Sequence, residues 1–330
     1  MYATAEGTAR YVNRFPDFLD AGFYRTVLDL TVSTLGIGTY LGDATDAADR
    51  AYTDALLAAA ENGINFFDAA INYRNQRSER CIGAALKQLQ RDEIIVCTKA
   101  GFLTPGAVPA GLPPEDIAGG FHSMAPLFLA DQIERSRANL GVDTIDVFYL
   151  HNPETQLGFV SRGQFDDRIR RAFAHLEKLA EEGSIRWYGT ATWEGYRKKG
   201  LLDLTRLAQI AAEVGGADHR FRWIQLPFNL GMVEALDQTK VLAEAGRLGI
   251  AAVASATLLQ SRVLEQMPDA VAALLPGLNT AAQRAIQFTR STPGIAVALV
   301  GMSRREHVLE NAGVAKIPPA TREQYMQLYR

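Results

Sequence analysis

The sequence predicts an α/β protein of the (β/α)8 TIM-barrel class. Short apolar runs rich in Ile, Val and Phe alternate with longer segments of helical period, and this alternation continues nearly to the end of the chain. Eight such runs are present, and glycines separate several helical segments from the run that follows. Repeated strand and helix units of this kind imply parallel strands.

The expected elements follow one another in a regular order. The strands are expected at 34–39, 64–68, 94–99, 145–151, 185–190, 223–226, 251–255 and 296–301. The helices are expected at 47–62, 78–89, 131–140, 169–182, 201–214, 233–248 and 281–292. Each of Gly63, Gly141, Gly183 and Gly249 suits the left-handed position after a helix, and Asp131 suits a helix N-cap.

Two segments interrupt this rhythm. Residues 102–127 carry several prolines and glycines after the third strand, and they predict a long loop at the carboxyl end of the barrel, where substrate loops lie. Residues 1–25 precede the repeated pattern as an N-terminal extension with Tyr11, Phe15 and Phe18. This extension either covers one end of the barrel or forms a mobile tail.

Composition limits the classes of function. The chain has 330 residues, with 48% hydrophobic and 22% charged residues, and we find no Pro/Ser/Gly-rich linker, so a single domain over 1–330 is expected. A formal net charge of -3 without a basic block argues against a nucleic-acid partner. No apolar stretch approaches the roughly 18 residues of a membrane span, so no membrane partner is expected.

The cysteines and the N-terminus predict the compartment. Cys81 and Cys97 lie in apolar patterns and are expected to be buried reduced thiols. The first residues lack the apolar region of a secretory signal, so a cytoplasmic protein is expected. We expect no metal site.

The chemistry-bearing residues lie just after the strands. Asp68, Lys99 and His151 each end a predicted strand, and strand parity places all three at the mouth of the barrel if Phe66, Cys97 and Tyr149 point inward. Tyr73 follows Asp68 by five residues. A tyrosine titrates near 10, and an ammonium held by a carboxylate lowers that pKa. Each of these residues alone also fits an ordinary structural role. Three ionisable side chains at the same ends of three different strands, however, favour a catalytic site.

Four segments together carry a family resemblance: FFDAAINY, CTKAG, FYLHNP and LVGMSRREHVLEN. From near Tyr24 to about Pro318 the chain resembles the aldo-keto reductase superfamily. The resemblance implies that Tyr73 is the proton donor and acceptor, that Lys99 lowers its pKa and that Asp68 pairs with Lys99. It also implies that His151 orients the substrate carbonyl while a nicotinamide supplies hydride.

The resemblance also implies a cofactor site. LGIGTYLG resembles the first glycine-rich turn of the family, although it is not the Rossmann fingerprint and is a weak signal by itself. Where the family usually has a Ser-Asn pair, this chain has Ala191 and Thr192, and Ala254 replaces an aromatic residue. The implied cofactor contacts are Gly38, Thr39, Tyr40, Asp68, Thr192, Gln225, Ser255, Leu258, Ser303, Arg304, His307, Glu310 and Asn311.

The expected cofactor is NADP(H), since Ser303 and Arg304 suit a 2′-phosphate at a helix start. Gly301 replaces the lysine of some family members, so NAD(H) stays open. The expected pocket walls are Tyr40, Phe102, Phe121, His122 and Trp193.

The expected activity is the NAD(P)H-dependent reduction of an aldehyde or ketone, or the oxidation of an alcohol. The partner would be a small carbonyl or alcohol substrate, and the sequence predicts no oligomeric state. One alternative is an NAD-dependent sugar or alcohol dehydrogenase. Another is a nicotinamide-binding regulatory subunit with vestigial activity, similar to the potassium-channel β-subunits that share the fold.

Overall fold

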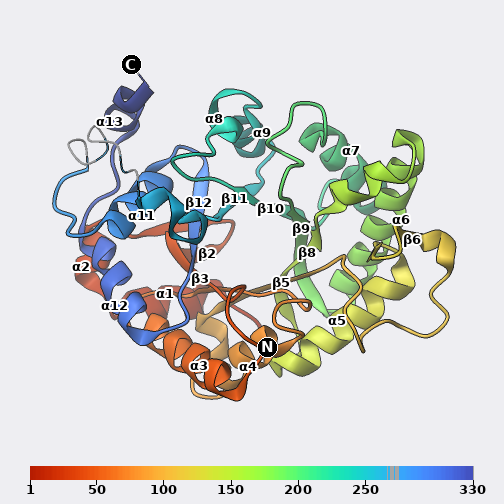
Figure 1. The fold of residues 1–330 in the computed structure, drawn as a ribbon, viewed down its shortest axis with the longest axis horizontal. Coiled ribbons are helices and arrows are strands. Elements are labelled where there is room, and N and C mark those ends of the chain that lie inside the picture. The colour runs from red at the N-terminus through yellow and green to blue at the C-terminus, as the bar shows by residue number, and fades with distance from the viewer. Residues whose placement is uncertain (266, 268–270, 272–274, 330) are drawn as a thin grey trace.

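Eight parallel strands form a closed barrel in the computed structural model, which describes residues 1–265, 267, 271 and 275–329 (Figure 1). Around the barrel the strands follow one another as β10, β11, β12, β3, β4, β5, β8 and β9. They are β3 (Leu35–Gly38), β4 (Phe66–Asp68), β5 (Ile95–Ala100), β8 (Ile145–His151), β9 (Ile185–Ala191), β10 (Phe221–Pro227), β11 (Ala251–Ser255) and β12 (Ile295–Gly301). The predicted fold class and all eight strands are confirmed.

Helices surround the barrel (Figure 1). They are α3 (Asp46–Glu61), α4 (Arg77–Leu86), α5 (Pro126–Leu140), α6 (Arg162–Glu181), α7 (Leu204–Gly215), α8 (Glu234–Asp237), α9 (Val241–Arg247), α11 (Ala281–Ser291), α12 (Arg305–Ala312) and α13 (Arg322–Met326). The left-handed φ angles of Gly63 (83°), Gly141 (66°), Gly183 (80°) and Gly249 (67°) confirm the four predicted helix ends.

Two helix predictions were wrong. The helix predicted at 233–248 is two short helices, α8 and α9, because Lys240 takes a left-handed conformation with φ 56° between them. Asp131 is not an N-cap: α5 begins five residues earlier at Pro126, a residue that suits the first helical position. Asp131 instead forms an i,i+4 ion pair with Arg135 inside the helix.

Alternate strand residues fill the barrel. Phe66, Cys97 and Tyr149 are fully buried in one interior cluster with Trp223, as the strand parity predicted. Close packing requires a glycine at position 189 of β9, because a Cβ atom there would lie 2.0 Å from the carbonyl oxygen of Trp223 in β10. Both cysteines are buried and free, which confirms that prediction.

The N-terminal extension closes one end of the barrel. Helices α1 (Ala5–Val12) and α2 (Pro16–Asp20) precede a hairpin of β1 (Tyr24–Val27) and β2 (Leu30–Ser33). Ala3, Val27, Leu30 and Val32 pack into the interior cluster. The Asp146 carboxylate of β8 accepts hydrogen bonds from the backbone N–H of Ala3 at 2.7 Å and of Val96 at 2.8 Å. The sequence predicted that the extension either covers one end of the barrel or forms a mobile tail, and the structure shows that it covers the end.

The segment after β5 is irregular over most of its predicted length. It contains a short hairpin of β6 (Ile117–Ala118) and β7 (His122–Ser123), and α5 takes its last two residues. Within the described residues we find no helix long and apolar enough to cross a membrane. No group of His, Cys, Asp and Glu suited to hold a metal ion occurs among them either.

Candidate active site

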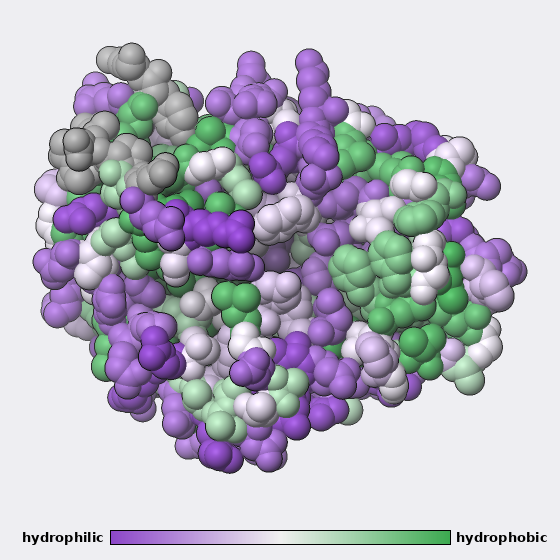
Figure 2. Space-filling view, in the orientation of Figure 1, coloured by the Kyte–Doolittle hydropathy of each residue, from purple (hydrophilic) through white to green (hydrophobic). Residues whose placement is uncertain are grey.

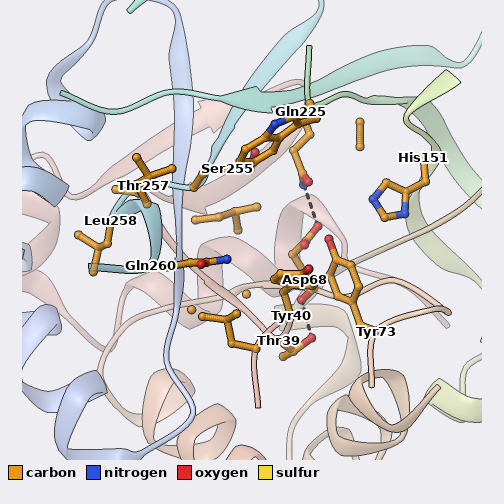
Figure 3. Close-up of a pocket in the computed structure, with 18 of the residues that line it drawn as sticks. Thr39, Tyr40, Asp68, Tyr73, His151, Gln225, Ser255, Thr257, Leu258 and Gln260 are labelled. Atoms are coloured by element: carbon orange, nitrogen blue, oxygen red, sulfur yellow. Dashed lines mark hydrogen bonds between the residues drawn. The ribbon is translucent and has the colours of Figure 1, made fainter. Parts of the chain in front are cut away.

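An ion pair lies at the carboxyl ends of β4 and β5. The Lys99 Nζ donates to Asp68 Oδ2 at 2.7 Å and to the carbonyl oxygen of Ala69 at 2.6 Å. The other carboxylate oxygen, Asp68 Oδ1, accepts a hydrogen bond at 2.8 Å from the Nε2 of Gln225 in β10 (Figure 3). Both charged side chains are almost fully buried. Because an unpaired buried charge would be strongly unfavourable, the two side chains are held together as a pair.

Tyr73 stands over this pair on the turn between β4 and α4. The Lys99 Nζ lies 4.9 Å from the centroid of its ring. The rings of Tyr40 and His151 lie edge-on to it, with centroids 4.8 and 5.8 Å away (Figure 3). The three strand-end residues and Tyr73 therefore meet at one mouth of the barrel, as the sequence predicted.

Burial raises the pKa of Tyr73 well above its usual value of 10, and the charge of Asp68 and the neighbouring Tyr40 add to this effect. The sequence predicted that Lys99 lowers the pKa of Tyr73, and this prediction was wrong. Because the Lys99 ammonium is bonded to Asp68, its charge is largely compensated at the phenol. Tyr73 is consequently a neutral phenol at physiological pH.

His151 and His122 are held neutral together. Burial lowers the pKa of His151 well below its usual 6.5, and the charges of Lys99 and His122 lower it further. The Nε2 of His122 donates to the backbone carbonyl of His151 at 2.8 Å, and its Nδ1 accepts from Gln156 Nε2 at 3.1 Å. The Nδ1 of His151 is buried and has no hydrogen-bond partner among the described residues.

A cavity of about 630 Å³ opens over these side chains (Figures 2 and 3). Figure 2 shows it as a recess near the middle of the face, with a mostly hydrophobic surface beside it where β6 lies in Figure 1. The predicted site residues that line it are Gly38, Thr39, Tyr40, Asp68, Tyr73, Phe102, His151, Thr192, Trp193, Gln225, Ser255 and Leu258.

Two of the predicted pocket walls do not line this cavity, which corrects that prediction. His122 is fully buried, and both of its ring nitrogens are already bonded. Phe121 lies behind Phe102, with ring centroids 6.4 Å apart, and is exposed on the outer surface. The ring of Phe102 contacts those of His122 and His151 edge-on, with centroids 5.2 and 5.1 Å away, and Phe102 is the residue that lines the cavity.

The predicted phosphate-binding residues lie just beyond the cavity, which ends at Gly301. Arg304 is the N-cap residue of α12, and its guanidinium lies 2.7 Å from the Nε2 of His307. The predicted contacts Ser303, Glu310 and Asn311 are also not lining residues; Asn311 is buried, and its Oδ1 has no partner among the described residues. A Cβ atom at Gly301 would meet nothing within 4 Å, so space is open before this helix.

Sequence reasoning missed several lining residues: Leu41, Asn72, Asn152, Thr257, Gln260 and Ser261. Asn72 and Asn152 adjoin Tyr73 and His151 in the sequence, and that adjacency was an available signal. Residues 257–261 follow β11, where a loop at the carboxyl end of a barrel strand also indicates a site.

Glu154 holds the loop after β9, a role that the sequence did not reveal. Its Oε1 accepts three consecutive backbone hydrogen bonds, from Trp193 at 2.9 Å, Glu194 at 3.0 Å and Gly195 at 3.1 Å. This carboxylate follows His151 by three residues, so it ties the end of β8 to the loop that carries Thr192 and Trp193. Trp193 stands at the mouth with 46% of its surface exposed.

Orphaned polar atoms show that the cavity suits a polar ligand such as a nicotinamide nucleotide. The hydroxyl oxygens of Thr192 and Thr257 are buried without a hydrogen-bond partner among the described residues. Such groups normally find a partner in a protein or a ligand. Gln225, by contrast, already donates to Asp68, so its carboxamide is only partly free for a cofactor.

Some known proteins match most of the chain, and others match less than half of it. The Aldo/keto reductase family model matches residues 34–329. D-threo-aldose 1-dehydrogenase from Pseudomonas is 36% identical over 146 residues, which span 41% of each chain. A probable voltage-gated potassium channel subunit beta from Arabidopsis thaliana is 24% identical over 315 residues, which span 88% of this chain and 89% of that one.

A solved structure shares the fold. The crystal structure of an aldo/keto reductase from Klebsiella pneumoniae, in complex with NADP and acetate, superposes with a TM-score of 0.68 at 21% identity, covering 91% of this chain and 93% of that one. Because the family model spans residues 34–329 and the barrel has the same architecture, the chain belongs to the aldo/keto reductase family.

Proposed function

We propose that this protein is an NAD(P)H-dependent oxidoreductase that reduces aldehydes or ketones to alcohols, or runs the reverse reaction. The observation that carries the proposal is the position of Tyr73 over the buried Lys99 and Asp68 pair, beside a neutral His151, in one cavity. Carbonyl reduction requires a proton donor and a polar group that orients the carbonyl. Tyr73 and His151 would supply them, and the Lys99 and Asp68 pair lies beside the donor.

Tyr73 is the proposed general acid in reduction. Its phenol gives its proton to the carbonyl oxygen, and in alcohol oxidation it takes the proton back. The raised pKa keeps the phenol protonated in the reducing direction, and the Lys99 ammonium beside the ring is compensated by Asp68. A neutral His151 holds the carbonyl oxygen by donating an N–H hydrogen bond, since its lowered pKa excludes an imidazolium at neutral pH.

The cofactor would lie along the cavity from Gln225 to the start of α12. When bound, the nicotinamide supplies or accepts the hydride. Thr192 offers its free hydroxyl to the carboxamide, and the loop with Ser255 and Leu258 covers the middle of the nucleotide. Ser303 and Arg304 at the start of α12 suit a phosphate, so we favour NADP(H) over NAD(H).

A second candidate is the oxidation of a sugar or another polyhydroxy alcohol, as in the aldose dehydrogenase relative. The cavity lining includes the uncharged polar side chains of Asn72 and Asn152 and the exposed rings of Tyr40 and Trp193. Aromatic faces and amide groups together suit a neutral hydroxylated ligand. A regulatory subunit with vestigial turnover has less support, because Asp68, Tyr73 and His151 line one cavity and Lys99 pairs with Asp68.

The deciding experiment compares the wild-type protein with Tyr73→Phe. NADPH oxidation is followed with a panel of aldehydes, and alcohol oxidation with NADP+ and a panel of sugars. We expect the variant to lose at least about a hundredfold in kcat, because general acid catalysis contributes about that much. Equally slow rates for both proteins on every substrate would end the enzyme proposal. Equal dissociation constants for NADPH and NADH, measured by tryptophan fluorescence, would remove the phosphate role of Arg304.

A further inference from the structure

The turn that carries Tyr73 has an unusual backbone. Arg74, Asn75 and Gln76 follow it with φ angles of 48°, 53° and 68°, so three consecutive residues without glycine are left-handed. This conformation is unfavourable for residues with a Cβ atom, asparagine being the best tolerated of the three. Such a run persists only where the surrounding structure holds it, and strained backbone of this kind gathers at functional sites.

The side chain of Arg74 supplies that hold. This side chain is 1% exposed. Its Nε and Nη2 donate to the carbonyl oxygen of Asp43 at 3.0 and 2.8 Å, and Nη2 also pairs with the carboxylate of Asp49 in α3. The guanidinium lies over the ring of Tyr52, 4.9 Å from its centroid. Four separate contacts thus fix one buried group.

These contacts join the two loops that border Tyr73. Asp43 belongs to the loop after β3, and Tyr52 holds the same loop through a 2.5 Å hydrogen bond from its hydroxyl to the carbonyl of Leu41. That loop also carries Tyr40, whose ring contacts Tyr73 edge-on (Figure 3). The guanidinium therefore joins the residue that follows Tyr73 to the loop that carries Tyr40.

We propose that Arg74 is a positioning residue, which fixes the Tyr73 phenol by clamping the left-handed turn 74–76 to the loop of residues 40–43. The inference rests on the proposed function, because a proton donor gains from a fixed position. A donor displaced by about 1 Å loses up to about a hundredfold in rate. Arg74 itself does not line the cavity, so we expect its loss to reduce the rate of the chemical step more than it weakens cofactor binding.

The kinetic test compares Arg74→Met with Arg77→Met. Arg77 is the matched control, because it also binds Asp49, at 2.5 Å, yet it contacts no backbone carbonyl of the 40–43 loop and is partly exposed. For Arg74→Met we expect kcat to fall about ten- to a hundredfold, with the dissociation constant of NADPH changed less than about twofold. Arg74→Lys should recover only part of the loss, because one ammonium cannot reproduce the planar set of donors.

Backbone hydrogen exchange gives a second readout that needs no turnover. Peptides covering 69–77 and 39–46 should exchange faster in Arg74→Met and not in Arg77→Met. If Arg74→Met does not fold, the same two measurements on Arg74→Lys decide the matter. The proposal would be overturned if Arg74→Met had the kcat and the hydrogen exchange of the wild type. It would also be overturned if Arg77→Met lost as much kcat as Arg74→Met. A wild-type protein without turnover would instead overturn the proposed function and leave the exchange comparison valid.

Discussion

Among single residues, burial has more influence on protonation than the neighbouring charges do. The pKa of Tyr73 is raised, although a lysine lies beside its ring, and the pKa values of both histidines behind it are lowered. In each case burial is the largest cause, because a charge inside the protein loses its hydration. The sequence places an ammonium near a phenol but does not show how deeply both are buried.

His122 predicts how stability depends on pH. Burial lowers its pKa from 6.5 to about 4, so between these values the unfolded chain binds a proton that the folded chain does not. Its contribution is complete above pH 6.5 and is lost as the pH falls toward 4. From pH 7 to 5 we expect it to remove about 2 kcal/mol from the free energy of unfolding.

Urea unfolding of wild type and His122→Asn at pH 7 and pH 5 measures this effect. The variant should lose about 2 kcal/mol less over the interval than the wild type does. His175 and His219, whose pKa values are also lowered, remain in both proteins and cancel from the comparison. The pKa of His151 depends partly on His122, but burial is its largest cause and is present in both proteins. An identical loss in both would contradict the assignment.

Sequence reasoning succeeded for residues whose position follows from strand parity and failed for those defined by packing. Asp68, Lys99 and His151 end apolar strands, so their meeting at one mouth could be predicted. His122 was taken for a pocket wall because nothing in the sequence shows that Gln156 and the backbone of His151 occupy its ring. Arg74 gave no signal, since a left-handed turn without glycine leaves no mark in the sequence.

At the scale of elements, the contact between α4 and α5 depends on one glycine. A Cβ atom at Gly83 would lie 2.5 Å from the carbonyl oxygen of Asn139 and 2.9 Å from that of Leu140, both backbone atoms that cannot turn aside. The same helix carries the buried Glu79, whose Oε1 accepts from Thr98 of β5 at 2.6 Å. Displacing α4 would therefore disturb the strand that carries Lys99.

Gly83→Ala should destabilise the protein by about 1 to 3 kcal/mol, the usual cost of overpacking. Helix propensity alone predicts the opposite sign, a gain of up to about 1 kcal/mol. Gly163 in α6 is the matched control, because a Cβ atom there would meet nothing within 4 Å, and Gly163→Ala should be neutral or stabilising. Thermal unfolding of both variants measures the difference, and a stabilised Gly83→Ala would refute the packing argument.

Element boundaries were predictable where local chemistry sets them. The eight strands follow from their apolar runs, and the four glycines mark helix ends because each must be left-handed. The break at Lys240 and the early start of α5 could not be predicted, since lysine rarely adopts a left-handed conformation and the proline at the start of α5 also fits a loop. At both positions the local sequence is compatible with a helix and with a break or loop, so it does not decide between them.

Over the whole molecule, stability and chemistry lie at opposite ends of the barrel. The N-terminal hairpin and Ala3 close one end, while Tyr73 and His151 lie at the other. Asp146 joins the closing segment to the barrel, because its carboxylate also accepts from Arg91 at 2.6 Å. Barrel enzymes generally keep the two roles apart in this way.

Asp146→Asn should lower stability and leave catalysis unchanged. The amide keeps one acceptor oxygen but turns an NH2 group toward donors, so about 2 to 4 kcal/mol should be lost from the free energy of unfolding. Chemical denaturation measures the loss, and kcat is measured well below the melting temperature. A kcat reduced more than about threefold in the folded variant would show that the two ends are coupled.

The compensated ion pair beneath Tyr73 also determines how molecules reach the site. Among the described lining residues Asp68 is the one that carries a formal charge with His151 neutral, and Lys99 balances it. The chamber is therefore close to electroneutral, and an uncharged substrate enters by diffusion without a guiding field. We expect its second-order rate constant to be insensitive to ionic strength, whereas binding of a dinucleotide whose phosphate lies near Arg304, as proposed, should weaken as salt screens that charge.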